Sequence, residues 1–146
     1  MSVRLVLVRH GLSSFNEKGL IQGRSDDSYL TSKGYEQALK SGEALSGINF
    51  DKIYSSPLVR AAETAKTIKK NLKGKHNIIY DKNLLEVDLG SWSGLTINDI
   101  KNKYPENYLI WKNDPENLNL ESIHNSSYQP IQELYEQANK FIRLII

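Results

Sequence analysis

Near its start the chain reads VRLVLV at residues 3–8, an aliphatic run interrupted only by Arg4, which leads directly into Arg9-His10-Gly11. A short run of aliphatic and β-branched residues is typical of a strand that is buried on both faces of a parallel sheet. In an open α/β sheet, ligands bind beyond the carboxyl ends of the strands. The sequence therefore predicts a buried strand over residues 3–8, with His10 at its tip, where a ligand would lie.

Three residues at the tip of this predicted strand have chemical uses. The Arg9 guanidinium can hold two phosphate oxygens at once, and Gly11 allows the backbone to turn sharply and a ligand to approach closely. The imidazole of His10 is a nitrogen nucleophile that can accept a phosphoryl group without a metal ion. Because so short a motif often arises by chance, a capped loop histidine without a function is an equally good interpretation of this segment alone.

A second motif follows a strand that the sequence predicts over residues 50–55. Ser56 is suited to cap a helix and Pro57 to occupy its first position, which places Arg60 in the first turn. A helix N-terminus favours anions and a guanidinium adds charged donors, although a solvent-facing arginine after an ordinary cap is the alternative. The expected packed face of this helix consists of Leu58, Ala61, Ala62, Ala65, Ile68 and Leu72.

A third motif follows a predicted strand over residues 77–80. Glu86 and Asp88 lie on the glycine-containing loop after this strand. Cleavage of a phosphate ester requires a proton for the leaving oxygen, and a buried glutamate with a raised pKa can supply that proton. Solvation of the loop is the simpler interpretation of these two acids when they are considered alone.

The other segments predict mainly helices. Strands that alternate with helices are typical of an α/β fold with a largely parallel sheet. We expect a surface loop over residues 12–30, a helix capped by Thr31 that runs to about Leu45, a short helix after a Thr96–Asp99 capping box, a helix over 105–111, an irregular polar stretch over 113–129 and an amphipathic helix over 131–146.

Length and composition suit one ordinary globular domain. Of the 146 residues, 39% are hydrophobic and 25% are charged, and the formal net charge of +2 gives no reason to expect a nucleic-acid partner. We find no apolar run of membrane-spanning length and no signal-peptide core, so we expect a cytoplasmic protein that does not bind a membrane. The chain has no cysteine and only three histidines, at positions 10, 76 and 124, so no disulfide, metal site or cofactor is expected.

Together the motifs resemble the histidine phosphatase superfamily, also called the phosphoglycerate mutase-like family. Three independent motifs in register are far more specific than any one of them. The resemblance implies a three-layer α/β/α sandwich of the phosphoglycerate mutase type. The matching stretches, in the family's order and spacing, are Arg9-His10-Gly11 with Asn16, Gln22–Asp26, Leu30–Gly34, Ser55–Ala61 and Leu85-Glu86.

The resemblance also implies a role for each matching residue. His10 would become the phosphohistidine, and Arg9 and Arg60 would bind the phosphoryl oxygens. Asn16 would donate to the same group, and Gly23 would line the pocket with its backbone. Two arginines around a phosphoryl group stabilise the charge on its equatorial oxygens. They also disfavour protonation of His10, which must be neutral to attack.

Within the family, the sequence is most similar to metal-independent phosphatases. Gly23-Arg24-Ser25-Asp26 has the phosphatase-like form, and the stretches at 103–106, 111–112 and 134–138 resemble a subgroup that includes phosphoserine phosphatases. This similarity makes Glu86 the candidate proton donor, after which water would hydrolyse the phosphohistidine. The expected partner is a small phosphorylated metabolite, and a homodimer is the candidate assembly.

One feature of the family is missing from the match. The family carries a second histidine on a later strand, which lies in the middle of the sheet between the first two strands. The chain ends at Ile146, within the helix expected before that strand, and His76 and His124 belong to a turn and a polar stretch. We therefore expect residues 1–146 to form an incomplete histidine phosphatase domain without its central strand, marginal in stability and poorly active.

Two alternatives to a phosphatase stay open. A phosphoglycerate mutase would need basic groups for the substrate carboxylate, and the loop after Glu86 shows no such cluster. A truncated module that binds phosphorylated ligands without catalysis, or a remnant with no role, would account for the missing second histidine. The motif set as a whole favours a phosphomonoester hydrolase that acts on a small metabolite.

Overall fold

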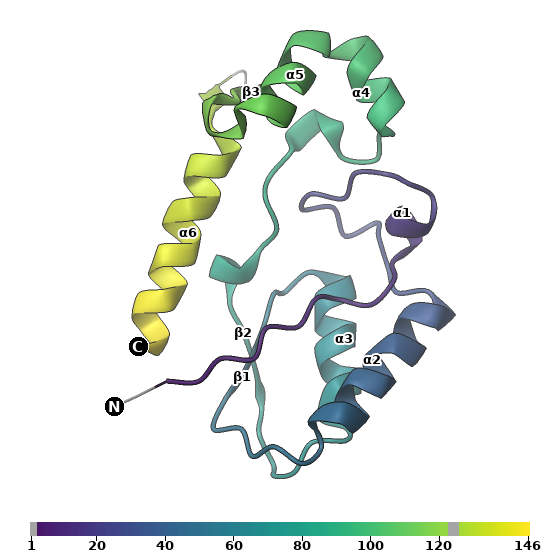
Figure 1. The fold of residues 1–146 in the computed structure, drawn as a ribbon, viewed down its shortest axis with the longest axis vertical. Coiled ribbons are helices and arrows are strands. Elements are labelled where there is room, and N and C mark those ends of the chain that lie inside the picture. The colour runs from purple at the N-terminus through teal and green to yellow at the C-terminus, as the bar shows by residue number, and fades with distance from the viewer. Residues whose placement is uncertain (1–2, 123–125) are drawn as a thin grey trace.

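The computed structural model describes residues 3–122 and 126–146 and holds far more helix than strand (Figure 1). The helices are α1 (Ser14–Glu17), α2 (Ser32–Leu45), α3 (Val59–Lys69), α4 (Ile97–Lys103), α5 (Pro105–Asn113) and α6 (Pro130–Ile145). The strands are β1 (Ile53–Ser55), β2 (Ile78–Tyr80), β3 (Leu120–Glu121) and β4 (Ser127–Tyr128). Short 3-10 helices lie at Lys82–Leu84, Gly90–Trp92 and Pro115–Asn117.

The parallel pair β1 and β2 lies next to α2 and α3. In its register Ile53 aligns with Ile78, and Ser55 with Tyr80. α2 packs against α3, which in turn contacts both strands. Parallel strands that alternate with helices confirm the predicted α/β class. The second pair, β3 and β4, is antiparallel and lies near α5, at the other end of the molecule (Figure 1).

The segment at residues 3–8 departs from its predicted structure. It is extended, but within the described part of the chain it belongs to neither two-stranded sheet. Its apolar side chains are exposed, Leu7 by 89% and Leu5 by 53%. A strand is stable only when a neighbour takes up its backbone groups, and the only partner that β1 has among the described residues is β2. The prediction of a buried strand here is therefore wrong.

The helices α2 and α3 begin at hydrogen bonds of different origin. The Thr31 hydroxyl accepts the Gly34 backbone N–H at 3.1 Å, so α2 begins after Thr31, as predicted. The N-terminus of α3 is different, because this helix begins at Val59 and its cap, Leu58, has no side-chain hydrogen bond. Instead, the Asp26 carboxylate accepts the Val59 N–H at 2.8 Å from a distant loop. The prediction that Ser56 caps this helix is wrong, since a tertiary contact supplies the acceptor.

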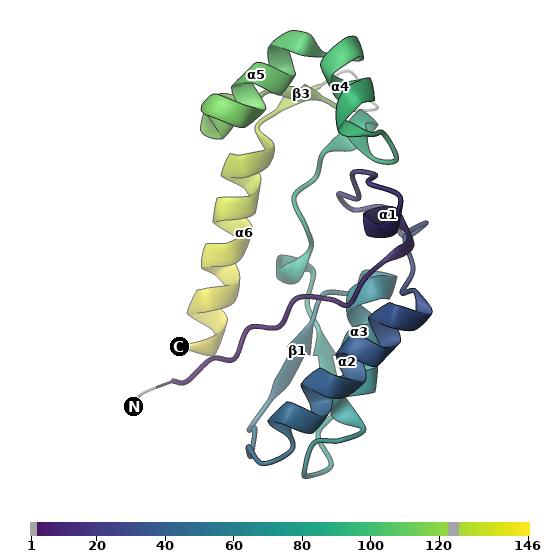
Figure 2. The ribbon, with the colours of Figure 1, turned by 45° about the vertical axis from the view of Figure 1, so that its right-hand side comes forward.

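The main apolar cluster lies at the end of the molecule that holds α4 and α5. Two of its members come from the stretch over residues 113–129 that the sequence presents as polar and irregular. α6 starts beside this cluster and runs past the loop that follows β2, and its far end lies beside the N-terminal segment in both views (Figures 1 and 2). Among residues 3–122 and 126–146, no helix is both long and apolar enough to cross a bilayer. The buried members of the cluster are Val87, Leu89, Trp92, Ile100, Leu118 and Leu120.

Candidate active site

His10 is half-buried at the end of the extended N-terminal segment. Its Nδ1 lies 2.7 Å from the carbonyl oxygen of Gly11. Because a carbonyl oxygen can only accept, Nδ1 must carry the hydrogen of the neutral ring. The other nitrogen, Nε2, then holds a lone pair, which is the form that a nucleophile needs.

Electrostatics favour this neutral form of His10. Burial lowers the pKa of the imidazole, and the hydrogen bond to the Gly11 carbonyl partly offsets that effect. The positive charges of Arg60 and Arg9 lower the pKa further, and the negative charge of Glu86 raises it. The net pKa lies below the ordinary value of 6.5. The two arginines therefore act on His10 in the direction expected from the sequence.

Close backbone packing, and not a sharp turn towards a ligand, is the reason for glycine at position 11. Its backbone is not in the left-handed region, and an added Cβ would overlap the carbonyl oxygen of Gly34 at the start of α2. Its N–H donates to the Thr64 hydroxyl at 3.1 Å, and that hydroxyl donates to the Arg60 carbonyl at 2.8 Å. The loop that carries His10 is thus tied to α2 and to α3. The roles of Gly34 and Thr64 are absent from our sequence interpretation, although Gly34 lies in a matching stretch.

Arg60 is almost completely buried, with 1% of its surface exposed. Its Nη1 donates to the Ser25 carbonyl at 2.9 Å and its Nη2 to the Gly23 carbonyl at 2.8 Å. The alternative of a solvent-facing arginine is therefore wrong. Burial lowers the pKa of Arg60, which the charges of Glu86 and Asp26 raise. Two carbonyls occupy two of the five N–H donors of a guanidinium, and the other three are buried with the rest of the side chain.

Arg9 and Asn16 are placed differently from Arg60. Arg9 is exposed, and its charge acts on His10. Asn16 is half-buried in α1, and its Oδ1 accepts from the Ser13 hydroxyl at 3.0 Å. That hydroxyl also contacts the Gln22 Oε1 at 2.6 Å, which accepts from Ser28 at 2.7 Å. The predicted surface loop over residues 12–30 therefore contains a helix and a partly buried polar network, a feature that its lack of hydrophobic periodicity does not reveal.

Gly23 is buried in the left-handed region, with φ of 49°. A Cβ there would make only ordinary contacts, 3.4 Å from the Leu89 nitrogen, so it is the left-handed backbone that favours glycine at this position. Glu86, in contrast, is exposed. Its Oε1 accepts the Val87 N–H at 3.1 Å, and its charge acts on both His10 and Arg60. The buried glutamate that the sequence interpretation called for is therefore not found, because the Glu86 side chain points to the surface while its loop neighbours Val87 and Leu89 are buried.

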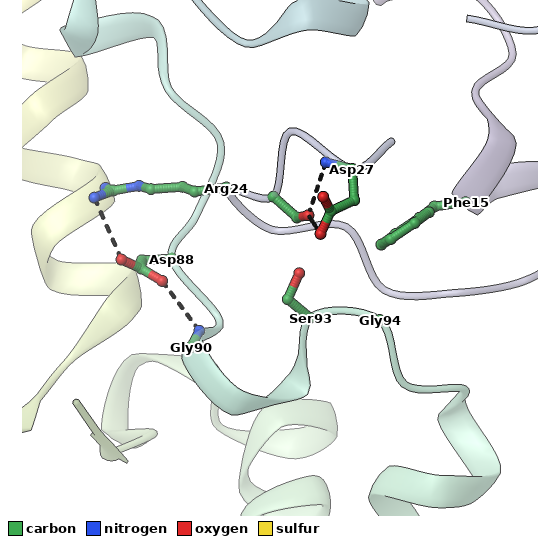
Figure 3. A pocket seen from close by; sticks show the side chains of 8 residues that line it. Phe15, Arg24, Asp27, Asp88, Gly90, Ser93 and Gly94 are labelled. Atoms are coloured by element: carbon green, nitrogen blue, oxygen red, sulfur yellow. Dashed lines mark hydrogen bonds and ion pairs between the residues drawn. The ribbon is translucent and has the colours of Figure 1, made fainter. Parts of the chain in front are cut away.

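A cavity of about 280 Å³ lies between the loops at residues 24–27 and 88–94 (Figure 3). Arg24 and Asp88 stand on one side of it and Phe15 on the other, and the Arg24 Nη1 lies 3.5 Å from the Asp88 Oδ2. The six candidate residues are not part of this lining. The cavity therefore borders the loops that hold Gly23 and Glu86 without containing His10.

The other two histidines lie apart from these residues or outside the description. His76 belongs to the turn before β2 and lies against Gly74. His124 lies outside the described residues. Among the residues that are described, we find no group of three or more His, Asp or Glu side chains that could hold a metal ion.

Known proteins are similar to this chain in sequence and in fold. A model of the histidine phosphatase superfamily (branch 1) matches residues 5–146. The chain is 38% identical over 135 residues to the 2-carboxy-D-arabinitol-1-phosphatase of Triticum aestivum, and 34% identical over 142 residues to phosphoserine phosphatase 1 of Hydrogenobacter thermophilus. The solved structure of Bacillus stearothermophilus YhfR matches with a TM-score of 0.82 at 27% identity.

These alignments cover most of the chain but only part of each relative. The alignment with the wheat protein includes 92% of the chain, and those with the Hydrogenobacter protein and YhfR each include 94%. The chain in turn spans 26% of the wheat protein, 65% of the Hydrogenobacter protein and 64% of YhfR.

Proposed function

This chain belongs to the histidine phosphatase superfamily, and from that membership we propose that it hydrolyses a small phosphorylated metabolite through a phosphohistidine at His10, without a metal ion. The names of the wheat and Hydrogenobacter relatives support a phosphatase as the reaction class. The single observation that carries the proposal is the hydrogen bond from the His10 Nδ1 to the Gly11 carbonyl, which leaves the Nε2 lone pair free to attack.

The proposed reaction has two steps. In the first, Nε2 of His10 forms a bond to phosphorus while the bond to the ester oxygen breaks, and Glu86 gives its proton to the leaving alcohol. In the second, water attacks phosphorus, the phosphorus–nitrogen bond breaks, and Glu86 takes back a proton. Inorganic phosphate leaves and His10 returns to its neutral form.

We assign to the two arginines the stabilisation of the negative charge on the transferred phosphoryl group. In phosphoryl transfer, negative charge spreads over the equatorial oxygens, and positioned guanidinium groups stabilise it. Arg60 is suited to this task because two backbone carbonyls already fix its side chain. In the proposal Arg9 approaches from the exposed side, Asn16 adds an amide donor and Gly23 contributes its backbone.

Hydrolysis of p-nitrophenyl phosphate by the full chain in the presence of EDTA tests this proposal. We expect His10→Ala to abolish turnover and to prevent labelling of the protein by the phosphoryl group, detected by mass spectrometry under conditions that preserve phosphohistidine. His76→Ala is the matched control and is expected to keep both signals. Equal activity of wild type and His10→Ala would show the mechanism to be wrong.

Binding and product assays separate the alternatives. Phosphate binding by calorimetry without any turnover would favour a non-catalytic protein that binds phosphorylated ligands. Isomerisation of a phosphoglycerate would favour a mutase. For the substrate itself, phosphoserine and 2-carboxyarabinitol 1-phosphate are the first compounds to compare, because the relatives carry these names.

A further inference from the structure

Two side chains from elsewhere in the chain bond the loop that carries Glu86, whose Val87 and Leu89 also pack into the apolar cluster. Residues 85–89 belong to no helix or strand of the described structure. The Arg24 Nε donates to the Glu86 carbonyl at 3.0 Å, and the Gln137 Nε2 of α6 donates to the Leu85 carbonyl at 2.7 Å. The Arg24 Nη2 also donates to the Gln137 Oε1 at 3.1 Å. Two linked side chains therefore hold consecutive carbonyls of this loop.

Asp88 adds a weaker contact on the same loop. It lies 3.5 Å from the Arg24 Nη1, and both side chains are partly exposed, so the ion pair itself contributes little. Its other oxygen accepts the Gly90 N–H at 3.0 Å (Figure 3). What distinguishes Arg24 is geometry, since one planar guanidinium reaches three acceptors in fixed directions.

The tripeptide Gly23-Arg24-Ser25 forms hydrogen bonds with two of the proposed functional residues, Arg60 and Glu86. Its first and third carbonyls accept from the Arg60 guanidinium. The side chain between them bonds the backbone of Glu86. The group that would bind the phosphoryl oxygens and the group that would donate the proton are thus set by one short segment.

We propose that Arg24 and Gln137 are positioning residues, which fix the backbone at Leu85 and Glu86 and thereby hold the Glu86 carboxylate for proton transfer. The inference rests on the proposed function, in which Glu86 is the proton donor. The link from backbone to carboxylate is short, because the Glu86 Oε1 accepts the N–H of the next residue, Val87, at 3.1 Å. A loop that shifts would carry the carboxylate with it.

The leaving group of the substrate makes this role measurable. A p-nitrophenolate leaves without a proton, whereas an alkyl alcohol needs one, so loss of the proton donor harms only the second reaction. We expect Arg24→Ala and Gln137→Leu to lower kcat for an alkyl phosphate by about 100-fold, and kcat for p-nitrophenyl phosphate by less than about threefold. KM should change little. Equal losses on both substrates would indicate a merely structural role and overturn the proposal.

Conservative, control and double variants sharpen the result. Arg24→Lys keeps the charge but not the planar donors, so it should behave like Arg24→Ala while its fold is retained. Gln132→Leu is an exposed control on the same helix and should match wild type. Arg24→Ala combined with Glu86→Gln should be no slower on the alkyl phosphate than Glu86→Gln alone. Full additivity of the two losses would contradict the inference.

Hydrogen exchange tests the same contact without any turnover. We expect the Val87 amide to exchange at least about tenfold faster in Arg24→Ala and in Gln137→Leu, while the Ala38 amide in α2 is unchanged. Unchanged Val87 exchange in both variants would overturn the positioning role. If the wild-type chain hydrolyses neither substrate, the proposed function fails, and the exchange data still decide whether these two side chains hold the loop.

Discussion

The backbones of Gly11 and Gly34 meet with no side chain between them. A Cβ on Gly11 would overlap the carbonyl of Gly34, and a Cβ on Gly34 would overlap the carbonyl of Leu12. This contact sets the N-terminal end of α2 directly against the loop after His10. The position of the imidazole therefore depends on two residues that have no side chain to contribute.

Gly11→Ala should destabilise the protein, because the methyl group has no space and its obstacle is backbone. Overpacking of this kind costs about 1–3 kcal/mol of unfolding free energy. Urea denaturation measures the loss, and Gly47→Ala is the control, because an added Cβ at Gly47 meets nothing within 4 Å. A Gly11→Ala protein as stable as wild type would mean that the two backbones can separate without cost.

Removal of the Arg60 guanidinium should weaken the fold as well as the site. Arg60→Met leaves the carbonyls of Gly23 and Ser25 without their buried donor, which we expect to cost about 2–3 kcal/mol of unfolding free energy. The pKa of His10 should rise in this variant, because one of the charges that lower it is gone. Urea denaturation and NMR titration of His10 measure the two effects. Arg143→Met, an exposed arginine of α6, is expected to change neither.

Protonation of His10 should make stability fall in acid. The folded pKa lies below the ordinary 6.5, so between these two values the unfolded chain binds more protons than the folded one. The unfolding free energy is then unaffected above pH 6.5 and decreases as the pH falls through the folded pKa. His10→Gln should remove this component. Unfolding curves at about pH 5 and about pH 7.5 test it, and an identical pH dependence in the variant would show that other groups are responsible.

Features with local causes are the ones that the sequence predicts well. The cap at Thr31 and the reciprocal capping box of Thr96 and Asp99 need only four residues each, and both are present in the structure. Parallel strands between helices likewise follow from the order of apolar and polar segments. His10, Arg60 and Glu86 were recognised from motifs, and their charges do act on one another.

Features with distant causes are the ones that the sequence does not reveal. The acceptor at the start of α3 is Asp26 rather than the adjacent Ser56, because a folded loop brings the carboxylate there. The bond between Arg24 and Gln137 joins residues 113 positions apart, which no periodicity encodes. The exposure of Leu7 has the same origin. An apolar pattern indicates that the side chains favour burial, but it does not show whether a neighbouring strand is present to bury them.

Residues 3–8 should make the chain self-associate. All of their side chains except that of Arg4 are apolar and exposed, and within the described structure their backbone belongs to no sheet, which is the arrangement that promotes edge-to-edge pairing. We expect sedimentation velocity to show association that increases with protein concentration. Leu7→Lys should reduce it, because a charge on an unpaired edge opposes pairing.

Leu7 is a sharp test because the two consequences of its substitution are separable. With 89% of its surface exposed, Leu7 contributes little packing, so Leu7→Lys should leave the unfolding free energy within about 0.5 kcal/mol of wild type. Leu109→Lys, at an exposed leucine of α5, adds the same charge elsewhere and should not change association. If both variants reduce association equally, net charge is the cause. If neither does, the extended segment is not the surface through which the copies meet.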